Sequence, residues 1–288
     1  MDRNEVIQKV YSKVDELPTL PIVLPKILSL MENEATSGMD IADAIASDPI
    51  ITSKLLKVAN SAYYGFQQEI SSLKKCIPLL GFNMVRSLAL SIGVIKSFPT
   101  ANKTSSFSRE NLWIHSVAVG TLMQEMGKKY RKGKDNEYLF VLGLLHDIGK
   151  VVLDQFFHEL FEQILEKSLH MNRIDLYAAE RQIIGIDHGE VGAILLRRWK
   201  FPEKIASTID VHHKNEVPEE GNPYDVAILR VADNLAMEFA CEGGHYEAPE
   251  LLDKDIMTLE INGDGLNDLK AFLESARDGI MAFFSAIN

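Results

Sequence analysis

The histidines and aspartates that could do chemistry in this chain are spread over one continuous part of it. In sequence order they are His115, the adjacent pair His146-Asp147, His188, the adjacent pair His212-His213, and Asp233. Imidazole and carboxylate together suit borderline divalent metals such as iron, manganese, nickel and zinc. A carboxylate has two oxygens, so Asp147 could bridge two ions. Two ions about 3.5–4 Å apart are the arrangement that hydrolyses phosphoesters.

Two residues in or near this series have more than one interpretation. Lys150 lies four residues after His146, on the same helical face, and could present its ammonium group to a phosphate. The alternative is that its amine simply reaches water from an apolar helix end. Asp233 lies in the apolar stretch 228–235, where an unpaired carboxylate is costly to bury. The alternative to a metal is an ion pair with Arg230, three residues earlier.

Two glutamates flank His188 in the sequence. Glu180 and Glu190 could accept hydrogen bonds from ligand imidazoles and so orient them, or they could form an exposed acidic face. The pair His212-His213, taken alone, is more typical of a surface helix end. For the whole series, the alternative to a metal site is a relic pocket of buried histidines.

Helical periodicity runs through nearly every segment that must position these residues. Asp48 and Pro49, for example, suit the cap and the first turn of a helix. The alternation from Met257 to Ile261, followed by Asn-Gly-Asp-Gly, could form a strand and a turn, although no partner strand is evident. The sequence therefore predicts an all-α fold, with helices near residues 3–14, 21–32, 38–46, 49–62, 71–80, 82–97, 108–130, 136–154, 157–169, 173–184, 187–199, 202–213, 222–240 and 265–286.

A change of composition suggests where the chain divides. Residues 99–106 are small and polar, which is typical of a connection between two packed units. We expect an N-terminal helical lobe over residues 1–100 and a helical core over residues 107–288 that ends in a C-terminal helix. The acidic stretch 214–223 carries glycine and prolines and is expected to be an exposed loop.

Composition narrows the classes of function. The chain has 288 residues, 46% hydrophobic and 25% charged, and a formal net charge of −11, which disfavours general nucleic-acid binding and attachment to anionic membranes. The start lacks the apolar segment of a signal peptide, and the apolar stretch 138–153 is interrupted by charged residues. Cys76 and Cys241 show no metal-binding spacing and fit a reducing compartment as buried small residues. We expect a cytoplasmic protein without a membrane segment.

Two blocks of the sequence resemble a known family. The second half carries Leu144-Leu-His-Asp-Ile-Gly-Lys150, Asp187-His-Gly-Glu-Val-Gly192, Trp199-Lys-Phe-Pro202 and His212-His213. The first half carries Leu17-Pro-Thr-Leu-Pro21, Asp48-Pro49, Val58-Ala-Asn-Ser-Ala62 and Leu80-Gly81. Together they resemble the HDOD proteins of bacterial signalling, which are part of the HD superfamily of metal-dependent phosphohydrolases and are related to HD-GYP domains.

The resemblance implies a multi-helical HD-type core with an N-terminal helical lobe, and a ligand set for one or two divalent transition-metal ions. One ion would be held by His115, His146, Asp147 and Asp233, and the other by Asp147, His188, His212 and His213. If the protein is catalytic, the resemblance gives the central roles to Asp147 and Lys150.

One departure from the HD-GYP pattern bears on function. After the paired histidines the sequence reads KNEVPEEGNPYD over residues 214–225, without the Gly-Tyr-Pro loop of the enzymes that cleave cyclic di-GMP. We therefore expect a signal-transduction output module that retains its metal site and acts through signalling protein partners. The alternative is an active phosphohydrolase or phosphodiesterase on a nucleotide or cyclic dinucleotide. A DNA-binding regulator has no basic stripe to support it.

Overall fold

The computed structural model describes residues 3–16, 23–31, 36–98, 107–131, 136, 138–170, 176–214, 222–240 and 251–287. Within these ranges the chain is helical and contains no strand, which confirms the all-α prediction. The helices of the first half are α1 (Arg3–Glu16), α2 (Val23–Met31), α3 (Gly38–Ala46), α4 (Pro49–Ala59), α5 (Leu73–Leu80) and α6 (Phe82–Ser97).

The second half supplies eleven further helices within the described ranges. They are α7 (Arg109–Tyr130), α8 (Leu139–Leu145), α9 (Ile148–Phe156), α10 (His158–His170), α11 (Leu176–Ile183), α12 (His188–Arg198), α13 (Glu203–Val211), α14 (Pro223–Ala240), α15 (Asp253–Leu259), α16 (Gly263–Ser275) and α17 (Arg277–Ile287).

Local sequence explains where several helices begin. Asp48 caps α4, because its Oδ1 accepts the backbone N–H groups of Ile50 and Ile51 at 2.9 and 3.0 Å, and Pro49 occupies the first helical position as predicted. Gly81 lies between α5 and α6 with a φ of 83°, a left-handed conformation that favours glycine. The axes of these two helices differ in direction by 117°.

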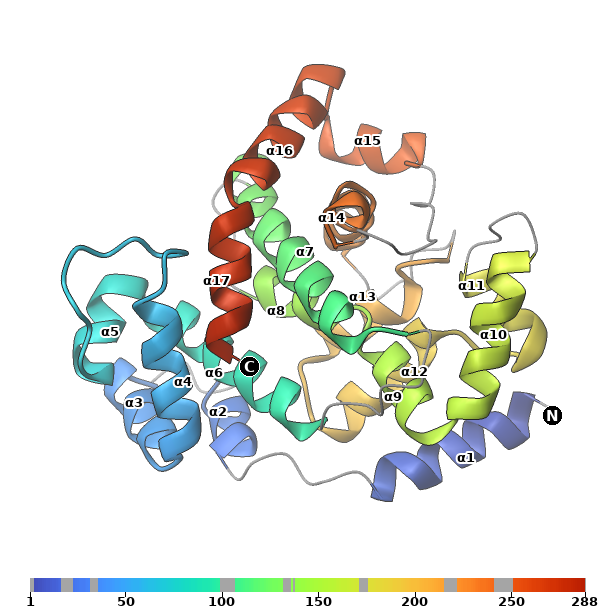
Figure 1. The fold of residues 1–288 in the computed structure, drawn as a ribbon, viewed down its shortest axis with the longest axis horizontal. Coiled ribbons are helices and arrows are strands. Elements are labelled where there is room, and N and C mark those ends of the chain that lie inside the picture. The colour runs from blue at the N-terminus through green and yellow to red at the C-terminus, as the bar shows by residue number, and fades with distance from the viewer. Residues whose placement is uncertain are drawn as a thin grey trace.

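The helices form two groups joined by a long central helix (Figure 1). Helices α2 to α6 pack on one another at one end of the molecule. Helix α7 runs through the middle and packs against α8 and α14, while α9, α12 and α13 pack together beyond it. The two terminal helices do not stay with their sequence neighbours, since α1 lies against α12, and α17 lies against α4 and α7.

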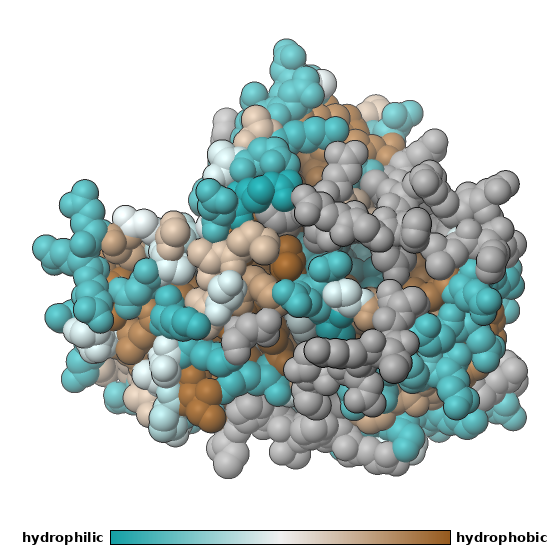
Figure 2. All heavy atoms as spheres, in the orientation of Figure 1, coloured by the Kyte–Doolittle hydropathy of each residue, from teal (hydrophilic) through white to brown (hydrophobic). Residues whose placement is uncertain are grey.

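The core is continuous through both groups and consists almost entirely of aliphatic and aromatic side chains. Phe140, Phe161 and Phe283 are among its largest fully buried members. On the face drawn in Figure 2, hydrophilic side chains cover the outer ends and the top of the molecule, with smaller hydrophobic areas between them. No single helix in the described ranges is long and apolar enough to cross a membrane, although the bent pair α5 and α6 together has sufficient length and apolar composition.

The structure corrects three expectations about the elements. The helix expected at 136–154 is two helices, α8 and α9, which are separated at His146-Asp147. The helix expected at 265–286 is also two, α16 and α17, which are separated at Ala276. The strand considered from Met257 to Ile261 is wrong, because these residues end α15 and lead into α16. Leu259 is buried from a helix, whereas Met257 is exposed, so the alternation reflects a helix end.

Some expectations fall on residues that the structure does not describe. These are the connection at 99–106, the motif at 17–21, most of the expected loop at 214–223, and Cys241. The division into residues 1–100 and 107–288 stays a prediction. Cys76 is buried, as expected of a small apolar core residue.

Candidate metal centre

The seven residues expected to bind metal come from five places in the chain and lie together in the interior. His115 is in the first half of α7, His146-Asp147 separates α8 from α9, His188 is the first residue of α12, His212-His213 follows the last residue of α13, and Asp233 is in α14. Six of them are buried, and His213 is partly exposed. The site thus lies where the ends of α8, α9, α12 and α13 approach the interiors of α7 and α14.

The break between α8 and α9 is what lets adjacent residues share one centre. Successive residues of an unbroken helix point about 100° apart. Here His146 is the C-cap of α8 and Asp147 is the N-cap of α9, with φ and ψ of −100° and 11° at Asp147. His146 Nε2 consequently lies 3.3 Å from Asp147 Oδ2. The site therefore depends on a break in the helix, which the helical periodicity of the sequence does not reveal.

Gly149 allows the helix that carries Asp147 to approach the helix that carries His188. A Cβ atom at position 149 would lie 1.9 Å from the carbonyl oxygen of His188 and 2.9 Å from the backbone nitrogen of Gly192. Any side chain there would force α9 away from α12. This is the physical reason for glycine in the segment His146-Asp-Ile-Gly-Lys150.

The first group of side chains contains His115, His146, Asp147 and Asp233. His115 Nε2 lies 3.0 Å and His146 Nε2 lies 3.6 Å from Asp233 Oδ1. Asp233 therefore faces the histidines. The alternative of an ion pair with Arg230 is wrong, because Arg230 pairs with Asp255 at 3.3 Å.

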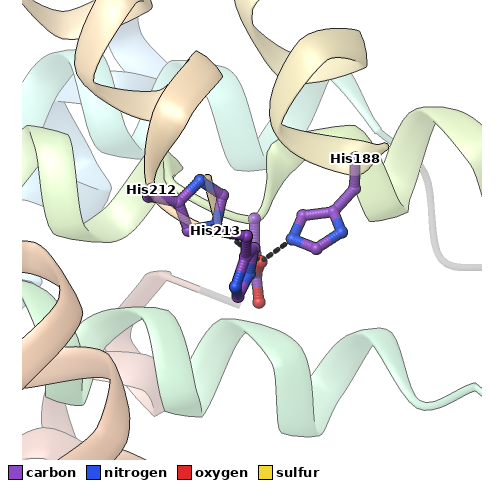
Figure 3. A group of neighbouring side chains, drawn as sticks. His188, His212 and His213 are labelled. Carbon is purple, nitrogen blue, oxygen red and sulfur yellow. Dashed lines mark ion pairs between the residues drawn. The ribbon is translucent and has the colours of Figure 1, made fainter. Parts of the chain in front are cut away.

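The second group contains Asp147, His188, His212 and His213. Asp147 Oδ1 lies 3.2 Å from His188 Nε2 and 3.9 Å from His212 Nε2. The ring of His213 lies 4.0 Å from that of His212 and 4.8 Å from that of His188, measured between centroids. Figure 3 shows the three labelled histidines arranged around one space. Because Asp147 offers one oxygen to each group, it is the residue that the two groups share.

Hydrogen bonds on the outer side of the rings fix which nitrogen faces inward. Nδ1 of His146 donates to the carbonyl of Gly143 at 2.7 Å, and Nδ1 of His212 donates to the carbonyl of Ile209 at 2.6 Å. A ring that donates through Nδ1 presents the lone pair of Nε2 on its other side. This tautomer is the one that metal-bound histidines use.

Several inward atoms are buried without a hydrogen-bond partner. They are Nε2 of His146, His188, His212 and His213, and Oδ1 of Asp147. Buried polar atoms in folded proteins nearly always have a partner, so five unpartnered polar atoms facing one space require an explanation. Nitrogen and oxygen acceptors of this kind fit a divalent cation. The residues present therefore fit the metal that the resemblance implies.

The side chains of the cluster differ in the direction in which their surroundings shift their pKa. Burial alone would raise the pKa of Asp147, but His146 and Lys150 beside it hold that pKa well below its usual range. Burial opposes a charge on His146, yet Asp147 and Asp233 raise its pKa to about 10. Burial lowers the pKa of His213 to about 3, and nearby His188 adds to that effect. Burial likewise opposes a charge on His188, yet Glu180 and Asp147 raise its pKa to about 9. The metal-free cluster thus combines protonated imidazoles at His146 and His188 with a neutral one at His213.

Lys150 lies on the solvent side of the cluster. Its Nζ is 2.6 Å from Asp147 Oδ2, and Lys150 and His213 are the partly exposed members of the group. Solvent therefore reaches the cluster at these two side chains. The neighbouring ring of Tyr177, 5.9 Å from that of His213, lies on the same side.

The two flanking glutamates have different roles. Glu180 is fully buried and contacts His188 at both its ring and its backbone, which is the orienting role considered from the sequence. Glu190 instead completes a capping box with Asp187 at the start of α12 and pairs with Arg181 at 2.6 Å. The contribution of Gly149 was not predicted, because only the packing of distant helices reveals it.

Comparison with known proteins places the chain in a family. The HDOD domain family matches residues 17–215. An uncharacterized protein of Treponema pallidum is 26% identical over 215 residues, which are 74% of this chain and 41% of that protein. The chain thus spans less than half the length of this relative.

Solved structures share the fold over nearly the whole chain. An HDOD domain protein of unknown function from Geobacter sulfurreducens has a TM-score of 0.76 and 25% identity, covering 99% of this chain and 97% of that one. A protein from Shewanella amazonensis SB2B, named as a candidate phosphohydrolase, has a TM-score of 0.78 and 22% identity, covering 97% and 98%. A candidate signal transduction protein from Marinobacter aquaeolei VT8 has a TM-score of 0.82 and 18% identity, covering 99% of this chain and 65% of that one. Since the family match covers more than half of the sequence, the chain belongs to the HDOD family.

Proposed function

We propose that this protein is a signal-transduction output module that binds divalent transition metal in its buried cluster and passes its state to protein partners. The observation that carries the proposal is the set of inward histidine nitrogens without partners. The expected ions are iron, manganese, nickel or zinc, because all four accept mixed imidazole and carboxylate ligands. Membership of the HDOD family supports the signalling role.

The chain offers ligands for two ions. His115, His146, Asp147 and Asp233 form what we call the mixed group, and Asp147, His188, His212 and His213 form the histidine-rich group. In the histidine-rich group, four ligand atoms lie within 4.8 Å of one another. Asp147 would serve both groups, so its loss should abolish binding at both.

A second candidate function is hydrolysis of a phosphoester, such as a nucleotide or cyclic dinucleotide. The observation that favours it is the position of Lys150, which places a cation on the open side of the cluster beside Asp147. Bound ions would supply Lewis-acid activation of water at neutral pH. Lys150 would attract and orient a phosphate oxygen.

Elemental analysis of protein purified without chelators tests the metal proposal. We compare the parent with the double variant His146→Ala/Asp147→Ala, and with His158→Ala as a matched control. His158 is a histidine outside the cluster that contacts Asp154 at 3.1 Å. The proposal expects about one or two equivalents of transition metal in the parent and the control, and none in the double variant. A parent that is empty and takes up no added iron, manganese, nickel or zinc would refute it.

A turnover assay separates the two functions. We would incubate metal-loaded parent and Asp147→Ala with bis(p-nitrophenyl) phosphate and with nucleotides, including cyclic dinucleotides. Turnover in the parent that disappears in Asp147→Ala favours the enzyme. Loaded parent without turnover favours the module, whose binding to a defined partner should then differ between the metal-loaded and chelated forms.

A further inference from the structure

A side chain from a different helix donates hydrogen bonds to the turn that carries His212 and His213. Arg230 of α14 donates through Nε to the carbonyl of His212 at 2.8 Å and through Nη2 to the carbonyl of Val211 at 3.1 Å. The same Nη2 also contacts the carbonyl of Lys214. Arg230 thereby donates to three carbonyls at the end of α13, where the last carbonyls of a helix have no intrahelical partners. The Val211 carbonyl also accepts the backbone N–H of Lys214 at 2.9 Å.

This contact is placed where it can control the histidine-rich group. The two histidines are the C-cap of α13 and the residue that follows it, so their side-chain directions depend on the conformation of this short turn. Nδ1 of His212 is bonded within the same turn, to the carbonyl of Ile209. A turn held by one guanidinium at three carbonyls has little freedom to rotate its side chains away.

Arg230 is three residues before Asp233 on the same helix. Asp233 faces His115 and His146 in the mixed group, while Arg230 holds the backbone of the histidine-rich group. One stretch of α14 therefore reaches both groups. Asp233 faces the mixed group with its own side chain, and Arg230 holds the backbone carbonyls beside the histidine-rich group. We call this set of Arg230 contacts the clamp.

A further residue holds the guanidinium. Asp255 of α15 is buried, and its Oδ1 lies 3.3 Å from Arg230 Nη1. Burial raises the pKa of Asp255, and the adjacent Arg230 opposes that effect. Asp255 lies beyond the family match at 17–215 and is in a helix that packs on α14. The clamp thus connects a part of the chain outside the family match to the candidate ligands.

We infer that Arg230 is a positioning residue for the histidine-rich group and that Asp255 acts through it. This inference rests on the proposed metal binding. Arg230 touches no candidate ligand atom, so it acts by fixing the turn at His212-His213. Its loss should weaken the histidine-rich group and leave the mixed group nearly unchanged.

Titration with Co²⁺, followed by visible absorption, tests this inference one group at a time. His115→Ala leaves the histidine-rich group complete, and His188→Ala leaves the mixed group complete. We would add Arg230→Gln to each of these single variants. Substitution of residues that orient metal ligands typically weakens binding by about 10–100-fold. We expect a loss of that size in Arg230→Gln/His115→Ala and less than about threefold change in Arg230→Gln/His188→Ala.

Three further variants make the assignment specific. Arg230→Lys keeps the charge and some of the donors, so it should recover part of the lost affinity. Asp255→Asn should give a smaller loss than Arg230→Gln, because the clamp keeps its carbonyl contacts. Arg197→Gln is the matched control, since Arg197 pairs with Glu203 and Asp210 on α13 and contacts none of the clamped carbonyls.

Hydrogen exchange provides a readout without metal. In metal-free Arg230→Gln, the backbone amides of residues 212–214 should exchange faster than in the parent, and in Arg197→Gln they should not. Equal weakening of both groups, or unchanged Co²⁺ affinity in Arg230→Gln/His115→Ala, would overturn the inference alone. Absence of Co²⁺ binding with Arg230 intact would overturn the proposed function, and the inference with it.

Discussion

Glu180 and His188 are joined by two hydrogen bonds to one oxygen. Glu180 Oε2 accepts the ring Nδ1–H of His188 at 2.7 Å and its backbone N–H at 2.9 Å. Both residues are buried, so the pair fixes the ring in the tautomer whose Nε2 faces Asp147. The carboxylate also makes that nitrogen a stronger base and a better candidate ligand.

Glu180→Gln should therefore weaken the histidine-rich group selectively. The amide can still accept the Nδ1–H bond, but it supplies no negative charge, and we expect about a 10–100-fold loss of affinity. Isothermal titration with Zn²⁺ measures this loss. Glu203→Gln, a change at an exposed glutamate paired with Arg197, is the control. Affinity equal to that of the parent in Glu180→Gln would contradict this role.

The stability of the metal-free protein should depend on pH in opposite directions at His146 and His213. The pKa of His146 is raised to about 10, so this group stabilises the fold fully below pH 6.5, and its contribution fades as the pH rises toward 10. The pKa of His213 is lowered to about 3, so the unfolded chain binds the extra proton and stability falls as the pH drops from 6.5 toward 3.

Urea unfolding of chelator-treated protein between pH 4.5 and 9.5 checks this dependence. In His146→Ala the unfolding free energy should fall less as the pH rises, and in His213→Ala it should fall less as the pH drops. A parent whose stability rises steadily from pH 6.5 to 9.5, with no change in slope in His146→Ala, would refute the charge assignment.

Metal uptake by the mixed group should strengthen with pH. An ion must displace the proton of His146, whose pKa is about 10. Displacement of one proton makes the apparent affinity rise about tenfold per pH unit below that pKa. Competition with a chromophoric chelator between pH 7 and 9, in the His188→Ala background, measures the slope of the logarithm of metal affinity against pH. A slope near zero would show that His146 is already neutral in the metal-free protein.

Gly149→Ala should destabilise the protein and impair the site together. The new methyl group would lie 1.9 Å from the His188 carbonyl oxygen, so α9 and α12 must separate. Overpacking of this kind costs about 1–3 kcal/mol of unfolding free energy. Gly263→Ala is the control, because a Cβ there meets no atom within 4 Å. Thermal unfolding and Zn²⁺ titration should show losses only in Gly149→Ala.

Cys76 should be unreactive in the folded protein. Burial raises the pKa of its thiol to about 11, so the nucleophilic thiolate is scarce at pH 8. In a Cys241→Ser variant, Ellman's reagent should react slowly in buffer and label one equivalent in urea. Rapid labelling without urea would mean that α5 opens readily.

The sequence predicts the helices better than it predicts their breaks. Apolar periodicity continues through His146 and through Ala276, so 136–154 and 265–286 each look like one helix, although each is two. At His146-Asp147 the break serves the site, because two adjacent side chains must face one centre. Periodicity reports which face is buried, and it carries no information about such a change of direction.

The candidate ligands could be selected from residue type and order, whereas their supports could not. All seven residues lie together, but their role as ligands stays a prediction. Glu180 was one of two equivalent glutamates in the sequence, and only the structure distinguishes it from Glu190. Arg230 seemed a partner for Asp233 three residues away, and instead it binds carbonyls nearly twenty residues earlier. Such contacts depend on helix packing that local patterns do not specify.

Each of the two terminal helices packs on the half of the molecule formed by the other half of the sequence. Helix α1 lies on α12, next to the candidate site, and Arg3 pairs there with Glu190 at 2.8 Å. Helix α17 lies on α4, in the opposite group. A cut anywhere between α6 and α7 would leave each fragment without a helix that covers its core. Each half of the sequence is therefore covered in part by a terminal helix that belongs to the other half.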